Sequence, residues 1–162
     1  MEWNFRIAQL SDLDRVTEIE YICFPAEQAA TRAAFEQRIK TFPSHFILLE
    51  HEGTPIGFVN GAVLDARYIE DEMYERTDSH NEQGAYQSVY GLDVLPEYRG
   101  RGLAHKLMAK LIDQAKKEGR RGVTLTCLEE KIGFYETMGF KNEGVSDSSH
   151  GGVVWNNMIL EF

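Results

Sequence analysis

The chain has 162 residues, of which 43% are hydrophobic and 27% charged, and its formal net charge at pH 7 is -9. These values predict one soluble domain over residues 1–162, because a domain usually spans about 100–200 residues. The negative charge argues against a nucleic-acid partner, since such partners bind to basic faces.

The N-terminal half predicts a short strand, two helices and a strand hairpin. Pro25 ends the first helical pattern, Thr31 is a suitable cap for the second, and Pro43 stops it. Two compact apolar runs then flank the turn-forming tetrapeptide at 51–54 (HEGT). The expected elements are a strand at 5–7, helices over 11–25 and 31–42, and strands at 46–50 and 55–59.

The segment 65–82 differs from the rest of the chain. It carries seven acidic residues and few large apolar ones. We expect a loop with a helical turn near Met73. Structureless loops of this length in a small domain are usually functional or mobile.

The C-terminal half alternates strands and helices. Leucines at every fourth position and a following Gly119 predict a long amphipathic helix with a left-handed C-terminal residue. The chain carries no internal repeat and no linker, so it predicts a single α/β domain. The expected elements are a strand at 86–94, a helix over 102–118, a strand at 123–127, a helix over 131–138, and two final strands at Phe140 and 153–160.

Several kinds of site and location are excluded by simple patterns. The two cysteines lie outside any CxxC pair, and the five histidines show no i, i+4 pair, so no disulfide framework or metal site is expected. The N-terminus lacks the pattern of a signal peptide, and no apolar run approaches the roughly 18 residues of a membrane span. We therefore expect a reduced, cytoplasmic protein with no membrane partner.

The stretch 96–105 (PEYRGRGLAH) joins the strand to the long helix and predicts an anion site. The first turn of a helix has unpaired backbone N–H groups and a partial positive charge, and glycines allow a phosphate to approach the backbone. Arg99 and Arg101 add positive charge. A P-loop is absent, and the dinucleotide pattern GxGxxG fails at His105. The alternative is a glycine turn with two solvated arginines.

Two ordered motifs resemble the GCN5-related N-acetyltransferase (GNAT) family. Arg99-x-x-Gly102-x-Ala104 is similar to the family's Q/R-x-x-G-x-G/A signature, between a strand and an amphipathic helix as in the family. The segment 134–140 (FYETMGF) is similar to its FYxxxGF segment. The resemblance covers essentially the whole chain. It implies a GNAT fold: one mixed, mostly antiparallel central sheet of about seven strands, flanked by about four helices.

The resemblance also implies acetyl-CoA as co-substrate and direct transfer of its acetyl group to an amine. Tyr135 matches the family tyrosine that protonates the departing thiolate, and a backbone N–H near Val94 would stabilise the charge that develops on the carbonyl oxygen. Packing against Phe134 is the alternative role of Tyr135. The residues expected to contact acetyl-CoA are Leu92, Asp93 and Val94 on the strand, and Arg99, Gly100, Arg101, Gly102, Leu103, Ala104 and His105 after it.

More narrowly, the chain resembles the arylalkylamine N-acetyltransferase branch. The points of similarity are Glu18-Ile19-Glu20 followed by Phe24, the acidic insertion, and Cys127 eight residues before Tyr135. That branch uses two histidines on the central strand to deprotonate the amine, but Ser88 and Tyr90 occupy these positions here.

The departure leaves the proton route open. Candidate acids are Glu27, Glu52 and those of the 65–82 insertion, although each is individually more typical of a solvated face. Cys127 ends an apolar strand and is expected to be a buried hydrophobe rather than a nucleophile. His150 lies in a flexible-looking turn, where a place at the edge of the substrate site is the alternative to the more typical role of a plain loop residue. The expected acceptor-site residues are Phe24, Pro25, Glu27, Ser88 and Tyr90.

The sequence therefore predicts an acetyl-CoA-dependent N-acetyltransferase acting on a primary amine such as a small amine, an arylalkylamine or a polyamine. The alternatives are a non-catalytic acyl-CoA-binding module and a protein N-terminal acetyltransferase. Nothing in the sequence decides between a monomer and a homodimer.

Overall fold

The computed structural model describes residues 2–162. Within that range the chain forms nine strands, four α-helices and several short 3-10 turns. The strands are β1 (Trp3–Ile7), β2 (Phe46–His51), β3 (Thr54–Asn60), β4 (Val63–Leu64), β5 (Tyr86–Val89), β6 (Gly91–Val94), β7 (Gly122–Cys127), β8 (Lys141–Val145) and β9 (Asn156–Glu161). The helices are α1 (Leu13–Cys23), α2 (Arg32–Thr41), α3 (Leu103–Lys117) and α4 (Ile132–Glu136).

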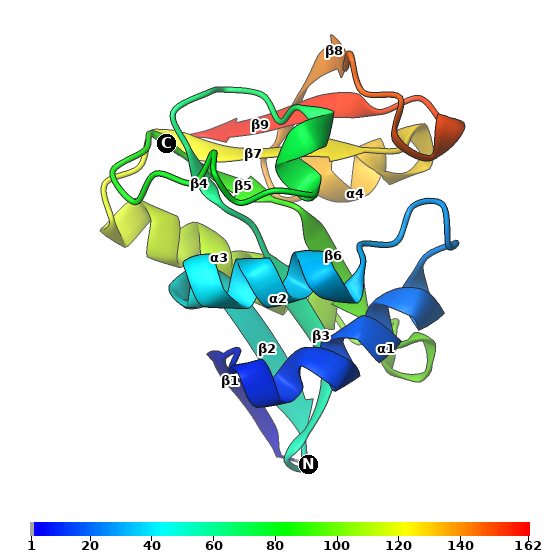
Figure 1. Ribbon diagram of the computed structural model, residues 1–162. Coiled ribbons are helices and arrows are strands. Elements are labelled where there is room, and N and C mark those ends of the chain that lie inside the picture. The colour runs from blue at the N-terminus through cyan, green and yellow to red at the C-terminus, as the bar shows by residue number, and fades with distance from the viewer. Residues whose placement is uncertain (1) are drawn as a thin grey trace.

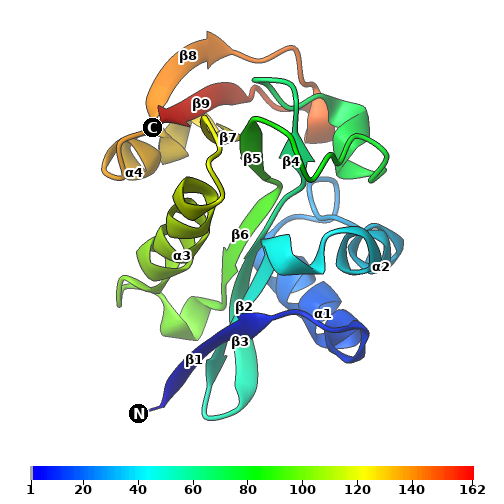
Figure 2. The same cartoon turned by 90° about the vertical axis from the view of Figure 1, so that its left-hand side faces the viewer.

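The strands form two sheets that lie end to end (Figure 1). One has the order β1-β2-β3-β6 and the other the order β4-β5-β7-β9-β8. All pairs are antiparallel except β5 with β7. Helices α1 and α2 cover one face of this layer, and α3 and α4 cover the other (Figure 2). The expected GNAT fold, with a mixed, mostly antiparallel sheet and four flanking helices, is confirmed.

The strand count differs from the expectation because the predicted strand 86–94 is two strands in two sheets. Its first half, β5, pairs with β7, whereas its second half, β6, pairs with β3. The change occurs at Tyr90, whose backbone N–H donates to Asn60 O at 2.7 Å. The two-residue strand β4 was also missed, because it carries no turn or periodic signal. The sheet therefore has nine strands in two parts rather than about seven in one.

The core lies between the first sheet and its helices. Phe35 of α2 packs edge to face on Phe58 of β3, with ring centroids 5.6 Å apart, and Phe46 of β2 lies 5.5 Å from Phe58. All three rings are fully buried. The expected hairpin of residues 46–59 is confirmed by the antiparallel pairing of β2 with β3. None of the helices between residues 2 and 162 combines the length and the apolar character needed to cross a membrane.

Two helix termini follow the sequence signals closely. The Thr31 hydroxyl accepts a hydrogen bond from Ala34 N at 3.1 Å, as expected of an N-terminal cap. Helix α3 begins after Gly102 and is followed by Gly119, whose φ of 79° is left-handed. The apolar stripe of α3 is buried, as the leucine spacing predicts.

The acidic insertion is held against the rest of the fold by hydrogen bonds and ion pairs near both of its ends. The predicted helical turn near Met73 is present as the 3-10 turn Asp71–Tyr74. Near its start, Arg67 pairs with Glu143 of β8, and its carbonyl accepts from Thr124 Oγ1 at 2.6 Å. The insertion therefore has a fixed position against the second sheet.

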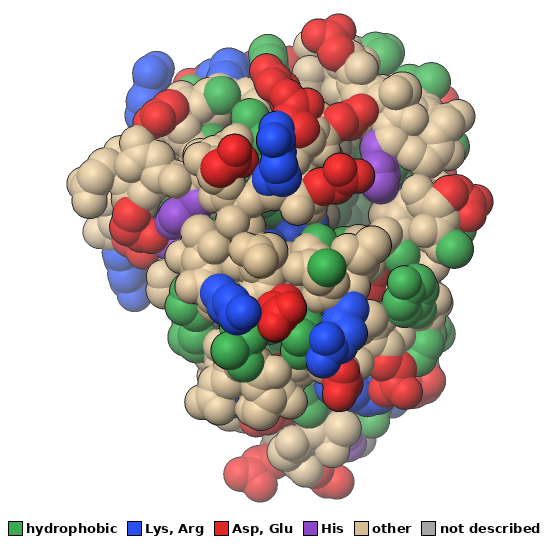
Figure 3. Space-filling model, viewed as in Figure 1, with side chains coloured by type: hydrophobic (Ala, Val, Ile, Leu, Met, Phe, Trp, Pro, Cys, Tyr) green, Lys and Arg blue, Asp and Glu red, His purple; other side chains and the backbone are tan. Residues whose placement is uncertain are grey.

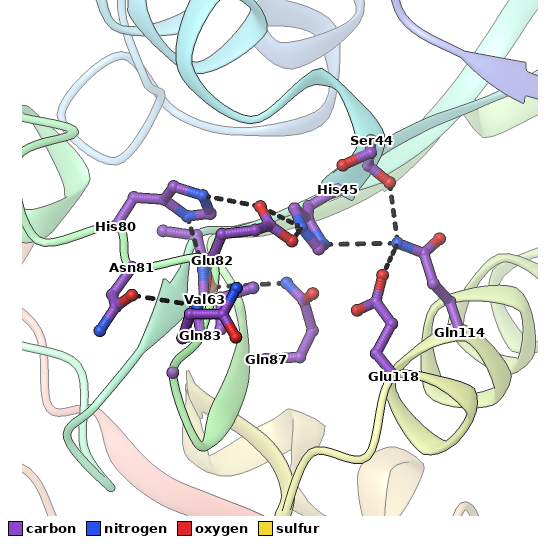
Figure 4. Close-up of polar contacts among 12 residues, drawn as sticks. Ser44, His45, Val63, His80, Asn81, Glu82, Gln83, Gln87, Gln114 and Glu118 are labelled. Carbon is purple, nitrogen blue, oxygen red and sulfur yellow. Dashed lines mark hydrogen bonds and ion pairs between the residues drawn. The ribbon is translucent and has the colours of Figure 1, made fainter.

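At the other end of the insertion, Glu82 is the centre of a polar cluster (Figure 4). Its carboxylate lies 2.9 Å from Nε2 of the buried His45, 3.0 Å from Nε2 of His80 and 3.2 Å from Nη2 of Arg120. The Val63 N–H donates to Nδ1 of His80 at 3.0 Å, so the ring proton of His80 resides on Nε2 and is donated to Glu82.

The same cluster has metal-ligand residue types, with ligand atoms of His45, His80 and Glu82 all within 4.8 Å of one another. To bind an ion, Nε2 of His80 would have to lose the proton that Val63 fixes there, and Arg120 would compete for the carboxylate. We interpret the cluster as a set of hydrogen bonds that holds the end of the insertion in place.

Candidate active site

A cavity of about 840 Å³ lies where β6 and β7 diverge into the two sheets. Its lining comes from α1 and the loop after it, α2, the insertion, β6, the loop before α3 and the start of that helix, β7, α4 and the loop before β9. Figure 3 shows a hollow between α2 and the segment that carries Asp71–Tyr74. Segments distant in the chain therefore meet around one space.

The strand β6 borders this cavity with an unpaired edge. It pairs with β3 along one edge, with Val94 opposite Gly57, and no strand among residues 2–162 pairs with its other edge. Leu92, Asp93 and Val94 all line the cavity. An extended ligand could therefore pair with backbone N–H and C=O groups of β6.

The loop after β6 leads to the N-terminus of α3. Gly100 has a φ of 80° and Gly102, the residue before the helix, a φ of 76°. No other atom lies within 4 Å of the Cβ position of either glycine. The glycines thus supply a left-handed backbone and an open approach to the unpaired N–H groups of the first helical turn.

All the residues expected to contact acetyl-CoA line this cavity except Arg101. The Arg101 guanidinium lies 5.9 Å from the Tyr98 ring centroid. Arg99 Nε donates to Val94 O at 2.9 Å, so part of this guanidinium holds the end of β6. His105 Nε2 lies 3.1 Å from Thr137 Oγ1 of the segment after α4.

Tyr135 lies on α4 and lines the same cavity. Its ring packs between Phe134 and Phe140, with centroid distances of 5.1 and 5.9 Å. Burial, followed by the charges of Cys127 and Asp93, raises the pKa of Tyr135. The phenol therefore keeps its proton at neutral pH and is chemically able to donate it.

Cys127 ends β7 and is 4% exposed. Burial, and then the negative charge of Glu130, raises its pKa to about 11. A thiol with such a pKa is protonated at neutral pH and is a poor nucleophile. This agrees with the expectation of a buried small hydrophobe.

One part of the cavity lining is rich in aromatic rings and comes from three separate segments. Phe24 and Pro25 lie after α1, Tyr74 on the insertion, and His150 and Trp155 on the loop before β9. The Tyr74 and His150 rings stack with an interplanar angle of 17° and centroids 5.8 Å apart. Trp155 Nε1 donates to the carbonyl of His150 at 2.7 Å. Tyr74 and Trp155 were not predicted as site residues, and a place at the edge of the substrate site was only the alternative expectation for His150.

The other expected acceptor-site residues have different positions. Ser88 is fully buried, does not line the cavity, and donates its hydroxyl hydrogen bond to Ala62 O at 2.6 Å. Glu27 is exposed and also lies outside the lining. Tyr90 lines the cavity, and burial raises its pKa to about 12. Only Phe24, Pro25 and Tyr90 of the five therefore border this space.

The lining also contains three charged side chains whose proximity was not predicted from the sequence. Glu20 lies on α1, Arg38 on α2 and Asp93 on β6, and all three are buried. Their separation in the chain explains why no spacing pattern connects them. The structure brings two carboxyls and one guanidinium together beneath the cavity.

Comparison with known proteins identifies relatives. The family model described as the acetyltransferase (GNAT) family matches residues 13–140. An uncharacterised N-acetyltransferase of Methanocaldococcus jannaschii is 32% identical over 114 residues, covering 68% of this chain and 45% of the relative. The chain therefore spans less than half of that relative.

A second relative matches over nearly the whole chain. The L-2,4-diaminobutyric acid acetyltransferase of Vibrio parahaemolyticus is 25% identical over 152 residues, covering 94% of this chain and 74% of the relative. Among solved structures, the GphF GNAT-like decarboxylase in complex with isobutyryl-CoA superposes with a TM-score of 0.85. It is 22% identical, and the match covers 98% of both chains, so the likeness is one of fold.

Proposed function

The chain belongs to the acetyltransferase (GNAT) family, and from this membership we propose that it transfers the acetyl group of acetyl-CoA directly to a primary amine. The active site we propose is the cavity between β6 and β7 within one catalytic domain. The acceptor we favour is a small amine with an apolar or aromatic body.

The open edge of β6 is the observation that carries the proposal. It borders the cavity and continues into the glycine loop at the start of α3. An extended arm bearing a pyrophosphate fits this arrangement, because the arm can pair with the strand while the anion meets the helix N-terminus. The positive φ values of Gly100 and Gly102 favour that approach.

Two groups of the chain would assist the transfer. The backbone N–H of Val94 is suited to stabilise negative charge that develops on the carbonyl oxygen of the acetyl group. Tyr135 is suited to protonate the departing sulfur, since its phenol is protonated at neutral pH and lines the cavity. Cys127 is not needed, because the amine attacks the acetyl group without an acyl-enzyme.

The acceptor class we favour follows from the aromatic part of the cavity lining. Tyr74, His150 and Trp155 present aromatic surface, which suits the apolar body of an arylalkylamine. The diaminobutyrate enzyme of Vibrio parahaemolyticus acts on a small, charged amine, so diamines and amino acids belong in the test.

A coenzyme A release assay over a panel of acceptors tests the proposal. The panel contains arylalkylamines, polyamines, L-2,4-diaminobutyrate and peptides with free N-termini. We expect turnover with at least one small primary amine. Turnover with peptides alone would favour an N-terminal acetyltransferase, and saturable acetyl-CoA binding without any turnover would favour a non-catalytic module.

A further inference from the structure

The two buried carboxyls beneath the cavity lack enough donors for their oxygens. Asp93 is 1% exposed and Glu20 6% exposed. Glu20 Oε2 accepts from Ala30 N at 2.8 Å, but no N–H or O–H donor of residues 2–162 reaches Glu20 Oε1 or either Asp93 oxygen. Buried acceptors of this kind are costly unless a proton is supplied.

The neighbouring guanidinium does not supply those donors. Arg38 is 2% exposed, and it donates through Nη1 to Asn60 Oδ1 at 3.1 Å and through Nη2 to Tyr74 O at 2.7 Å. Its positive charge balances only one of the two carboxylates. One proton held between Asp93 and Glu20 would restore neutrality and satisfy their facing oxygens.

The electrostatics of the pair agree with a held proton. Burial raises the pKa of Asp93 well above its ordinary value, and the negative charge and hydrogen bonding of Glu20 raise it further. The titratable and charged groups around the pair are Cys23 from α1, Arg38 from α2 and Tyr135 from α4. Tyr74 from the insertion and Tyr90 between β5 and β6 lie near Arg38. Arg38 alone among these carries a positive charge.

Gly91 leaves a path from the cavity to both carboxyls. It lines the cavity, and a Cβ at this position would lie 3.4 Å from Asp93 Oδ1 and 4.0 Å from Glu20 Oε1. The same point lies 3.4 Å from Asn60 Nδ2, which has no acceptor among the described residues. A polar group that binds next to Gly91 would therefore lie close to three polar atoms that lack hydrogen-bond partners.

We propose that Asp93 is the base that removes a proton from the ammonium form of the acceptor, and that Glu20 is a positioning residue that holds the proton after transfer. This inference rests on the proposed amine acetyltransferase function. In the form that reacts, Asp93 is ionised. The N–H bond of the ammonium breaks, its electron pair stays on nitrogen, and an O–H bond forms on Asp93, hydrogen-bonded to Glu20. The proton later leaves to solvent, and the neutral amine attacks the acetyl group.

The position of Asp93 suits this task. It directly precedes Val94, whose backbone N–H borders the site of acetyl transfer proposed above. An aspartate base also explains how this chain can deprotonate an amine without the expected histidines. Ser88 and Tyr90 replace them, and Ser88 lies outside the cavity. A base with a raised pKa is better matched to an alkylammonium than an ordinary carboxylate.

The variant Asp93→Asn tests the role through its dependence on the acceptor. With an alkylamine at neutral pH, we expect kcat/KM to fall about 10²–10⁴-fold and to recover as the pH approaches the pKa of the amine. With an aromatic hydrazine or aniline that is already neutral, we expect a rate near wild type. Equal losses with both acceptors, at unchanged thermal stability, would reduce Asp93 to a structural role.

The variant Glu20→Gln provides the matched comparison. Wild-type kcat/KM should fall as the pH drops through the raised pKa of Asp93, because only the ionised carboxylate accepts a proton. Removing the negative charge of Glu20 lowers that pKa, so the acid limb should move to lower pH. An unmoved acid limb would contradict the coupling.

Infrared spectroscopy tests the held proton without any acceptor. Wild type should show the carbonyl band of a protonated buried carboxyl at a pH below the raised pKa of Asp93 and lose it as the pH rises through that pKa. Both Asp93→Asn and Glu20→Gln should lack it, since a single carboxylate beside Arg38 ionises. A wild-type protein without the band would overturn the inference, whereas a wild type with the band that acetylates no amine would contradict only the proposed function.

Discussion

The two sides of the cavity are built in different ways. The side bounded by β6 and the start of α3 comes from one continuous stretch, residues 91–105, and presents mainly backbone groups. The other side comes from the loop after α1, the insertion and the loop before β9, and presents side chains. The first is a local structure, and the second exists only after the chain has folded.

Because of this difference, the two sides are suited to recognise different ligands. Backbone N–H groups and left-handed glycines suit an anion and an extended arm, which many ligands share. Side chains such as Tyr74 and His150 define shape and polarity, which differ from one acceptor to another. We therefore expect mutations on the first side to affect acetyl-CoA and those on the second to affect the amine.

Among the variants that probe this comparison, the largest effect is expected at Tyr135 on α4, which lines the same cavity. The change Tyr135→Phe removes the proposed proton donor but keeps the ring between Phe134 and Phe140. We expect kcat to fall about 10²–10³-fold while the acetyl-CoA dissociation constant stays within about twofold. Steady-state kinetics and titration calorimetry would measure both.

Tyr86→Phe is the matched control, because Tyr86 is also buried but does not line the cavity. Its turnover should remain close to wild type. If Tyr135→Phe retained the wild-type rate at every pH, the proton-donor role would be withdrawn and the packing role of the ring would remain.

The local side was largely predictable from the sequence. Gly102 and Gly119 mark the two ends of α3, and the leucine spacing identifies its buried face. These signals act over a few residues, since they depend on backbone conformation and helical period. The hairpin of β2 and β3 was predictable for the same reason.

The other side was not predictable, because its residues are neighbours only through tertiary contacts. Tyr74 and His150 are far apart in the chain, and so are Glu20 and Asp93. The break of the predicted strand at Tyr90 was missed as well, because residues 86–94 carry no sequence signal that their two halves pair with strands of different sheets. Charge or aromaticity at a single position cannot reveal its partner.

The change Gly102→Trp tests the side built from backbone. A bulky side chain at the start of α3 would occupy the open approach to the helix N-terminus. We expect acetyl-CoA to bind at least about 10-fold more weakly, equivalent to roughly 1.4 kcal/mol. Titration calorimetry with acetyl-CoA gives the measurement.

Gly119→Trp controls for backbone strain at the other end of the same helix. Gly119 has a similar φ of 79° and equally open surroundings. Both variants should lose stability by about 1–2 kcal/mol, the cost of a left-handed non-glycine residue. Equal acetyl-CoA affinities in the two variants would rule out the glycine loop as the anion site.

The change Tyr74→Ala tests the side built from side chains. It removes the ring that stacks on His150 and keeps the carbonyl that accepts from Arg38. An aromatic contact of about 0.5–1.5 kcal/mol corresponds to a rise of roughly 2- to 13-fold in the KM for an aromatic amine. The KM for acetyl-CoA should not change.

Tyr68→Ala is the matched control from the same insertion. Tyr68 is 40% exposed and bonds to Glu143 away from the cavity lining. Its acceptor KM should equal that of wild type. A rise in the acetyl-CoA KM of Tyr74→Ala would show that the two sides are not separable as we describe them.

The smallest effect concerns the Glu82 cluster that fastens the insertion to the rest of the fold. Burial lowers the pKa of His80 below its ordinary value of 6.5, so the folded state binds a proton less readily than the unfolded state. Stability is therefore fully present above about pH 6.5 and decreases as the pH falls below it. We expect the melting temperature to fall between pH 7 and pH 5, because the unfolded state takes up a proton on this ring more readily than the folded state. His80→Asn keeps an acceptor for the Val63 N–H and removes the titrating ring, so its melting temperature should depend less steeply on pH over this range. An unchanged slope would mean that the insertion is fastened by Arg67 and Arg120 without a contribution from the titration of His80.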